Sequence, residues 1–299
     1  MRLRPLAVGL LVGALALTAC GREGSPSDNA AGSSPAPSFT PASDVKLDGS
    51  PTFQRMKGRD QVVIGVKEDQ PQLGYKDPTS GKYTGFDIEI ARMIAAKLGY
   101  GEDKIQFKAV ASVGREQAIA NGDVDYYVGT YTISDKRKEQ ISFAGPYYVA
   151  GQDLLVRKDD TSITGKDSLK GKKVCSVTGS TPLQRVSDQQ LTEANNIVSF
   201  QNYSQCVQQL DQKQVDAVTT DDAILKGYAA LEPDKFKVVG NTFSSEPYGV
   251  GLAKDDKVLR DKINDVLQES FDNGTWQQVY DSTLGKSGAK AEKPKLDRY

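Results

Sequence analysis

The sequence contains no histidine, and this absence removes several kinds of catalytic site at once. Ser-His-Asp triads and Cys-His pairs need an imidazole to accept a proton, and most zinc sites need one as a ligand. We therefore expect no metal, no cofactor and no nucleophilic catalysis of these types. Chemistry that uses carboxylates alone is not excluded by the composition.

The chain also lacks an excess of charge of either sign. It has 38 Lys and Arg against 39 Asp and Glu, so the net charge is −1, and the two signs are interspersed. A nucleic-acid-binding surface needs a basic patch or stripe. We therefore expect no nucleic-acid partner.

Long apolar runs are missing apart from residues 6–17, which follow Arg2 and Arg4. A run of about a dozen residues is too short to span a bilayer but has the length of a signal-peptide core. The run ends in Leu17-Thr18-Ala19-Cys20, which resembles a lipobox, the motif in which the cysteine is acylated after cleavage. We expect a signal peptide over residues 1–19 and a lipid on Cys20; the alternative is an ordinary secretory signal with a chance cysteine.

Large apolar side chains are scarce over residues 21–49, which are rich in Ser, Pro, Ala and Gly. Such a segment buries too little surface to offset the entropy of its chain. We expect a disordered, lipid-anchored tether over residues 20–56. The protein should then lie at the extracellular face of the cell membrane and touch the membrane through its lipid only.

Cysteine is rare, with Cys175 and Cys206 left after Cys20. In an exported protein two remaining thiols are expected to form a disulfide. The alternative is a pair of buried free thiols.

The folded part alternates strand and helix patterns, which predicts an α/β fold with parallel strands. Short β-branched runs predict strands, and apolar residues at four-residue spacing predict helices. The expected strands are 61–66, 105–110, 124–130, 153–157, 173–177, 197–200, 215–219, 237–239 and 248–253. The expected helices are 86–98, 115–121, 183–191, 204–210, 221–231, 258–271 and 276–280.

Three polar segments, 129–137, 177–182 and 218–222, follow predicted strands. Ligands of open α/β sheets bind beyond the carboxyl ends of strands, and these residue types suit a zwitterion. Arg137 offers a planar fork for a carboxylate, and the turn 179–181 opens a helix whose free N–H groups attract an anion. Asp221, with Thr132 and the carbonyl of Thr130, offers acceptors for an ammonium group. Each feature alone is more often a surface arginine or a helix cap.

Two longer segments resemble the polar amino-acid solute-binding proteins of ABC transporters. Residues 82–91 read KYTGFDIEIA, and residues 123–148 contain DVD, TYT, Arg137 and ISFAGPYY. Residues 175–182 (CSVTGSTP) and 216–225 (DAVTTDDAIL) are most similar to glutamate-binding lipoproteins of high-GC Gram-positive bacteria.

The resemblance implies a two-lobed clamshell of the periplasmic-binding-protein type II, with hinge crossings near residues 147–152 and 244–248. Lobe 1 would be discontinuous, over residues 57–147 and 247–285, and lobe 2 would span 148–246. Residues 286–299 would form a loose polar tail.

The resemblance also implies roles for residues of the cleft. Arg137 would bind the α-carboxylate, Thr130 and Thr132 the amine and carboxylate, and Asp221 the amine. The turn Gly179, Ser180 and Thr181 would donate backbone N–H groups.

Side-chain specificity depends on Lys67, because glutamine-binding relatives carry an acidic residue at this position. A cation there favours an acidic ligand by charge complementarity; the alternative is that Lys67 is a rim residue facing water. Gln70 and Arg115 are further expected residues of the pocket.

These features predict a monomeric binding protein, not an enzyme, that delivers an amino acid to an ABC permease and its ATPase. The expected ligand is L-glutamate, followed by aspartate or glutamine. Two alternatives stay open: an enzyme on the same fold that uses Glu68 or Glu246 on a small carboxylic acid, and a ligand-sensing module for a membrane partner.

Overall fold

The computed structural model describes residues 37–287 and 292–299 of the chain. The expected signal peptide and Cys20 lie outside the described residues, as do residues 21–36 of the expected tether. In the part that the structure describes, no helix is both long and apolar enough to cross a membrane.

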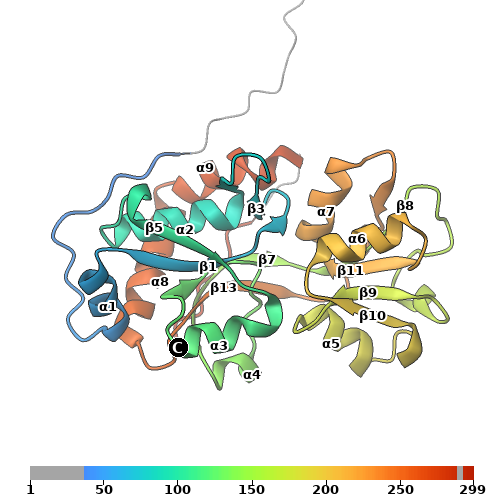
Figure 1. Cartoon of the computed structure of the whole chain (residues 1–299), viewed down its shortest axis with the longest axis horizontal. Coiled ribbons are helices and arrows are strands. Elements are labelled where there is room, and N and C mark those ends of the chain that lie inside the picture. Colours follow the sequence, from blue (N-terminus) through green and yellow to red (C-terminus); the bar gives the residue numbers. More distant parts are fainter. Residues whose placement is uncertain (1–36, 288–291) are drawn as a thin grey trace, which may run out of the picture. The chain divides into compact units, whose positions relative to one another are not determined.

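The first lobe contains a mixed five-stranded sheet in the order β5-β1-β6-β13-β7 (Figure 1). β1 is parallel to β5 and β6, whereas β13 is antiparallel to β6 and β7. A small antiparallel sheet of β2, β3 and β4 follows β1 along the chain. The strands are β1 (Val62–Val66), β2 (Asp69–Gln70), β3 (Gly74–Lys76), β4 (Tyr83–Thr84), β5 (Ile105–Ala109), β6 (Tyr126–Tyr127), β7 (Ser142–Ala150) and β13 (Glu246–Leu252).

Helices pack their apolar faces against this sheet. In α2 the expected four-residue series of Phe86, Ile90 and Ile94 is buried, and α8 buries Ile263 and Phe271 in the same core. Val258, expected on the apolar face of the last long helix, is instead partly exposed. The helices are α1 (Pro51–Arg59), α2 (Phe86–Lys97), α3 (Arg115–Ala120), α4 (Asp135–Lys138), α8 (Lys257–Asp272) and α9 (Thr275–Ser282), with short 3-10 turns at Glu102–Lys104, Ser112–Gly114 and Leu284–Ser287.

The second lobe repeats this plan with a five-stranded sheet in the order β10-β9-β11-β8-β12. β9, β10 and β11 are parallel, and β8 is antiparallel to β11 and β12. The strands are β8 (Gln152–Arg157), β9 (Val174–Val177), β10 (Ile197–Phe200), β11 (Ala217–Asp221) and β12 (Phe236–Val238). The helices are α5 (Thr181–Asp188), α6 (Tyr203–Asp211) and α7 (Asp222–Leu231), with 3-10 turns at Lys166–Leu169 and Ala194–Asn196.

The chain passes between the lobes twice, from β7 to β8 and from β12 back to β13 (Figure 1). Aromatic side chains surround these crossings. The indole N–H of Trp276 donates to the carbonyl of Tyr147 in β7 at 2.8 Å, and its ring stacks on Tyr280. Domain boundaries at 147/148 and 246/247 remain a prediction.

A disulfide joins Cys175 in β9 to Cys206 in α6. The disulfide expected for two remaining cysteines of an exported protein is therefore present, and the alternative of two free thiols is wrong. The bond ties a helix to the strand it covers within the second lobe.

The expected tether is wrong in its last part, because the chain is folded well before residue 57. Ser50 caps α1 by accepting from the N–H of Phe53, and Phe53 and Met56 are buried. Upstream of the helix, Phe39 and Val45 pack against the core of the first lobe. A few apolar side chains, such as Phe39, Val45 and Phe53, are thus sufficient to hold this segment against the folded chain, although its average composition is that of a linker.

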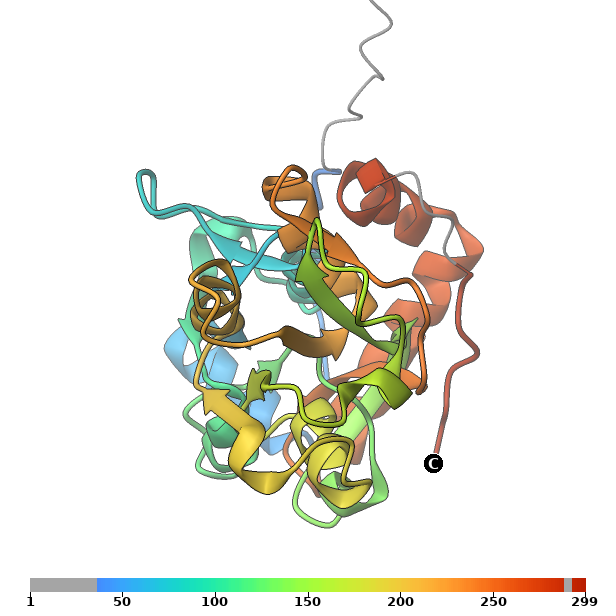
Figure 2. The ribbon, with the colours of Figure 1, turned by 90° about the vertical axis from the view of Figure 1, so that its right-hand side faces the viewer.

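The expectation of a loose tail is also wrong for residues 292–299. The backbone N–H of Asp297 donates to the carbonyl of Gly145 at 2.8 Å, and the hydroxyl of Tyr299 accepts from the N–H of Phe143 at 2.8 Å. Gly145 and Phe143 belong to β7, the edge strand of its sheet. Figure 2 shows this red segment running along α8, where Arg298 pairs with Asp265 at 2.7 Å. The tail therefore covers an otherwise open sheet edge.

Candidate functional site

Thr130 is held in a rare backbone conformation by a buried carboxylate. Its φ of 45° is left-handed, and its N–H donates to Asp87 Oδ2 at 3.0 Å. Asp87 also accepts from the hydroxyl of Tyr147 at 2.7 Å, and burial raises the pKa of Asp87 to about 6. The Thr130 hydroxyl donates to Gln70 Oε1 at 3.1 Å. These contacts fix the strand end that sequence reasoning assigned to the cleft.

Arg137 is positioned by the short helix α4 and by a carboxylate. Ser134 caps the helix by accepting from the N–H of Arg137, and Arg137 Nε lies 3.2 Å from Glu116 Oε1. Its Nη1 donates to the carbonyl of Thr132 at 2.7 Å, and its Nη2 donates to the carbonyl of Gly179 at 3.2 Å. The last bond crosses from the first lobe to the second.

Three cations are buried together on the first lobe. Lys67 is 5% exposed, Arg115 2% and Arg137 8%. Lys67 Nζ donates to Ser112 Oγ at 2.7 Å, and Arg115 lies 4.1 Å from the ring centre of Tyr131. Burial, and then the charge of Arg115, lowers the pKa of Lys67 well below its usual value. The alternative of Lys67 as a water-facing rim residue is wrong.

The three cations Lys67, Arg115 and Arg137 outnumber the carboxylates that pair with them. Within the described ranges, Arg137 pairs with Glu116, whereas Lys67 and Arg115 form no ion pair. Buried charges are stable when they are paired. The cluster therefore favours an anionic ligand.

The second lobe contributes the turn before α5. Ser180 caps the helix by accepting from the N–H of Leu183 at 3.1 Å, and Thr181 Oγ1 donates to Glu246 Oε2 at 2.8 Å. The hydroxyls of Thr132 and Thr181 lie 3.4 Å apart across the lobes. Gly179 has a φ of 81°, and a Cβ there would lie 2.6 Å from Val113 Cα.

Asp221, at the end of β11, presents an unused acceptor. Its Oδ2 accepts from the hydroxyl of Tyr248 at 2.6 Å, and its buried Oδ1 has no hydrogen-bond partner among the described residues. Burial, and then the nearby carboxylate of Glu246, raises the pKa of Asp221 to about 7. A buried acceptor without a partner is the group that an ammonium would satisfy.

These segments surround a small cavity between the lobes. Its walls are Ser112, Arg115, Thr130, Thr132, Arg137, Ser180, Thr181, Pro182, Tyr203, Asp221 and Ile224. Most of the expected binding residues therefore lie together. Lys67 lies behind Ser112, Gln70 lies behind Thr130, and Gly179 lies at the contact with Val113. Whether these residues bind a ligand remains a prediction.

Sequence reasoning missed several residues of this region. Ser112 and Tyr203 line the cavity although neither stands in a segment that suggested a ligand contact. Tyr248 and Glu116, which hold Asp221 and Arg137, were also missed. The only signal in the sequence for Glu116 was its position next to Arg115, an expected residue of the pocket.

The acids nominated for an enzyme are placed differently. Glu68 is exposed, whereas Glu246 is buried and lies 2.8 Å from Arg185 Nη2. Glu246 also accepts from Thr181 and Ser244. Its oxygens are therefore used to join β13 to the second lobe.

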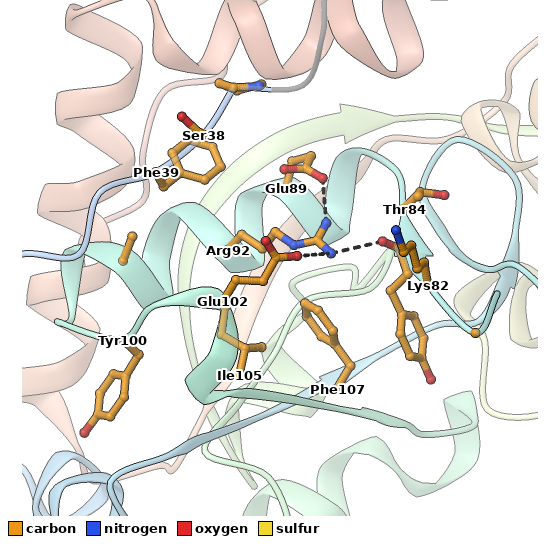
Figure 3. Close-up of a pocket in the computed structure, with 14 residues that line it drawn as sticks. Ser38, Phe39, Lys82, Thr84, Glu89, Arg92, Tyr100, Glu102, Ile105 and Phe107 are labelled. Carbon is orange, nitrogen blue, oxygen red and sulfur yellow. Dashed lines mark hydrogen bonds and ion pairs between the residues drawn. The ribbon is translucent and has the colours of Figure 1, made fainter.

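A larger groove lies on the first lobe between the segment around Phe39, α2 and β5, with an empty volume of about 1350 Å³ (Figure 3). Arg92 stands in its middle and points toward Glu89, Glu102 and the carbonyl of Tyr83, at 2.6, 3.2 and 3.1 Å. Arg92 is thus paired with acids of the groove itself, unlike Lys67 and Arg115, which are buried and form no ion pair among the described residues.

The fold and the cavity define a class: two α/β lobes with a small polar, charged site between them, as in binding proteins for small zwitterions. Residues 62–286 match the model of the bacterial extracellular solute-binding proteins, family 3. The chain belongs to this family.

Similar proteins and solved structures cover most of the chain. The glutamate-binding protein GluB of Corynebacterium efficiens is 38% identical over 235 residues, which is 75% of this chain and 79% of GluB. The ABC transporter glutamine-binding protein GlnH of Bacillus subtilis is 35% identical over 285 residues, or 95% and 98% of the two chains. The structure of an ancestral arginine-binding protein bound to arginine is 37% identical, with a TM-score of 0.70, over 75% of this chain and 98% of that one. The relatives thus differ in their amino acid, so the family alone does not define the ligand.

Proposed function

We propose that this protein binds L-glutamate between its lobes and delivers it to an ABC importer. In this proposal the chain is held at the extracellular face of the membrane by a lipid on Cys20, and it does not transform its ligand. Aspartate and glutamine are the next candidates as ligands.

The observation that carries the proposal is the buried cluster of Lys67, Arg115 and Arg137 opposite the free acceptor of Asp221. Arg137 would bind the α-carboxylate and Asp221 the α-ammonium. Lys67 and Arg115 would attract the side-chain carboxylate, because charges interact strongly in a partly dry cleft. The similarity to GluB supports the same ligand.

Calorimetric titration with glutamate, aspartate, glutamine, asparagine and arginine tests the proposal. We expect glutamate to bind most tightly, and Lys67→Met to weaken glutamate about tenfold while changing glutamine little, because loss of one nearby charge is worth on the order of 1 kcal/mol. Lys108→Met is the matched control, since Lys108 is a half-exposed cation of β5 with a distant partner at 3.9 Å. Equal affinity for glutamine in the parent would contradict the choice of glutamate, and no binding by any of the five would contradict an amino-acid ligand.

Localisation and turnover are tested separately. Cys20→Ser should release the protein from the membrane fraction into the medium, whereas retention would contradict the anchor. Glutamate incubated with the protein should be recovered unchanged; its consumption would favour the enzyme alternative.

A further inference from the structure

The lobes meet at a second place, beside the cavity, through the short strand β2 that follows β1. Asp69 Oδ2 accepts from the backbone N–H of Ser204 at 3.0 Å, at the start of α6. The hydroxyl of Tyr228 in α7 donates to the main-chain carbonyl of Asp69 and also lies 3.2 Å from its Oδ2. Asp69 is thus bonded to two helices of the other lobe, across 135 and 159 residues of sequence.

The backbones at this contact approach so closely that a side chain would separate them. A Cβ on Gly227, the residue before Tyr228, would lie 2.4 Å from the carbonyl oxygen of Pro71. Glycine is the residue that permits such close approach of backbone to backbone. The close packing of Gly227 against Pro71 therefore belongs to the closed arrangement of the lobes, in addition to the hydrogen bonds of Asp69.

None of the three residues Asp69, Ser204 and Tyr228 is among those that line the cavity. The contact on the other side of the cavity is different, because there Arg115 and Arg137 donate to the carbonyl of Gly179. Those arginines belong to the proposed ligand site, so that contact depends on the ligand. The hydrogen bonds of Asp69 and Tyr228 depend only on whether the lobes are closed, whereas the charge of Asp69 also acts on Lys67.

We propose that Asp69 and Tyr228 form an interlobe latch that raises the affinity for every ligand by the same factor, without touching any of them. A bond made only in the closed form shifts the opening equilibrium toward closure. The apparent affinity of a ligand that needs the closed form then rises with the closed fraction. Asp69 and Tyr228 are positioning residues in this scheme. Only the affinity measurement of this proposal rests on the proposed function; the comparison of unliganded proteins does not.

The test uses the full chain with Asp69→Asn and Tyr228→Phe, which remove a charge and a hydroxyl while preserving size. In Tyr228→Phe, which changes no charge, the affinities for glutamate and for glutamine should weaken by one common factor. In Asp69→Asn both should weaken, about tenfold for glutamine, as expected for loss of a charge-assisted hydrogen bond, and the factor for glutamate also includes the lost charge near Lys67. Stopped-flow measurements should place the change in a faster dissociation rate, with association unchanged. Small-angle scattering of the unliganded protein should give a larger radius of gyration for each variant than for the parent.

Asp77→Asn is the matched control, because Asp77 is also an acid near the β2–β4 sheet but accepts only from its own turn, at Thr79 and Ser80. It should leave affinity and radius unchanged. Unequal factors for glutamate and glutamine in Tyr228→Phe would overturn the latch, since Tyr228 would then act on the ligand. Unchanged affinities and radius in both variants would also overturn it.

Two further outcomes are separable. If the parent binds no amino acid, the proposed function fails, but the radii of the unliganded proteins still decide the latch. If Asp69→Asn does not fold by circular dichroism, Tyr228→Phe decides it, because the ring that packs in α7 is retained.

Discussion

The two faces of the cavity carry opposite chemistry. The first lobe brings the cations Lys67, Arg115 and Arg137, whereas the second lobe brings the start of α5 and the acid Asp221. In the proposed function, the first face holds the carboxylates with side chains that other contacts already fix, and the second face closes over the amine. The first lobe would then bind the ligand first, and the second would complete the closed form.

The largest effect should come from the first face. Arg137→Ala should weaken glutamate about a thousandfold, because loss of one partner of a buried charge pair costs several kcal/mol. Calorimetry measures this directly. Lys138→Ala, the neighbouring cation of α4 that pairs with Asp297, should bind as the parent does. Equal affinities of parent and Arg137→Ala would mean that the cavity is not the ligand site.

The second face can be disturbed without touching its charges. Gly179→Ala should weaken binding of glutamate by about a hundredfold, because the new methyl group meets Val113 and prevents closure, in addition to a strained left-handed backbone. Gly171→Ala is the control: its φ of 72° is similar, but its Cβ would meet nothing within 4 Å. If Gly179→Ala binds glutamate as tightly as Gly171→Ala does, the methyl group at Gly179 does not prevent closure.

The pH dependence distinguishes the faces further. In the proposed site the ammonium group of the ligand would bind the ionised carboxylate of Asp221, whose pKa without a ligand is raised to about 7. Binding favours the ionised form and so lowers this pKa. Affinity should therefore be constant above pH 7 and fall below it by up to about tenfold per unit, until the pKa of the complex is reached.

Titrations between pH 5 and 8 measure this profile, and free glutamate keeps its side-chain charge over that window, since its carboxyl titrates near 4.3. Asp221→Asn should bind more weakly and lose the fall that begins near pH 7, so that any remaining dependence lies near pH 6, where Asp87 titrates. A parent profile without a fall beginning near pH 7 would remove Asp221 from the ammonium site.

The smallest effect on binding should come from outside the cleft. Deletion of residues 292–299 should lower the melting temperature by a few degrees, because it uncovers the edge of β7, but should leave glutamate affinity unchanged. Scanning calorimetry and titration measure the two quantities. Arg298→Ala, which removes one exposed ion pair, should change neither. A loss of affinity in the deletion would show that the tail supports α4 through Lys138.

The sequence predicts the parts of the molecule whose pattern is local. The alternation of strands and helices is visible along the chain. The polar segments that follow strands place Thr130 and Arg137 beside the first sheet and Asp221 at the end of β11 in the second, and all three line one cavity between the lobes. The latch could not be predicted, since Asp69 and Ser204 are 135 residues apart and no periodicity connects them. The docking of α1 and of Tyr299 was missed for a similar reason: one or two well-placed side chains decide it, and average composition hides them.

Trp276 has a practical consequence. It is the only tryptophan of the chain, and its indole N–H is bonded to the carbonyl of Tyr147 on a strand that leads from one lobe to the other. Any rearrangement of that strand alters the polarity around a single fluorophore. The emission spectrum of the unlabelled protein should therefore follow closure in real time, with no dye to attach.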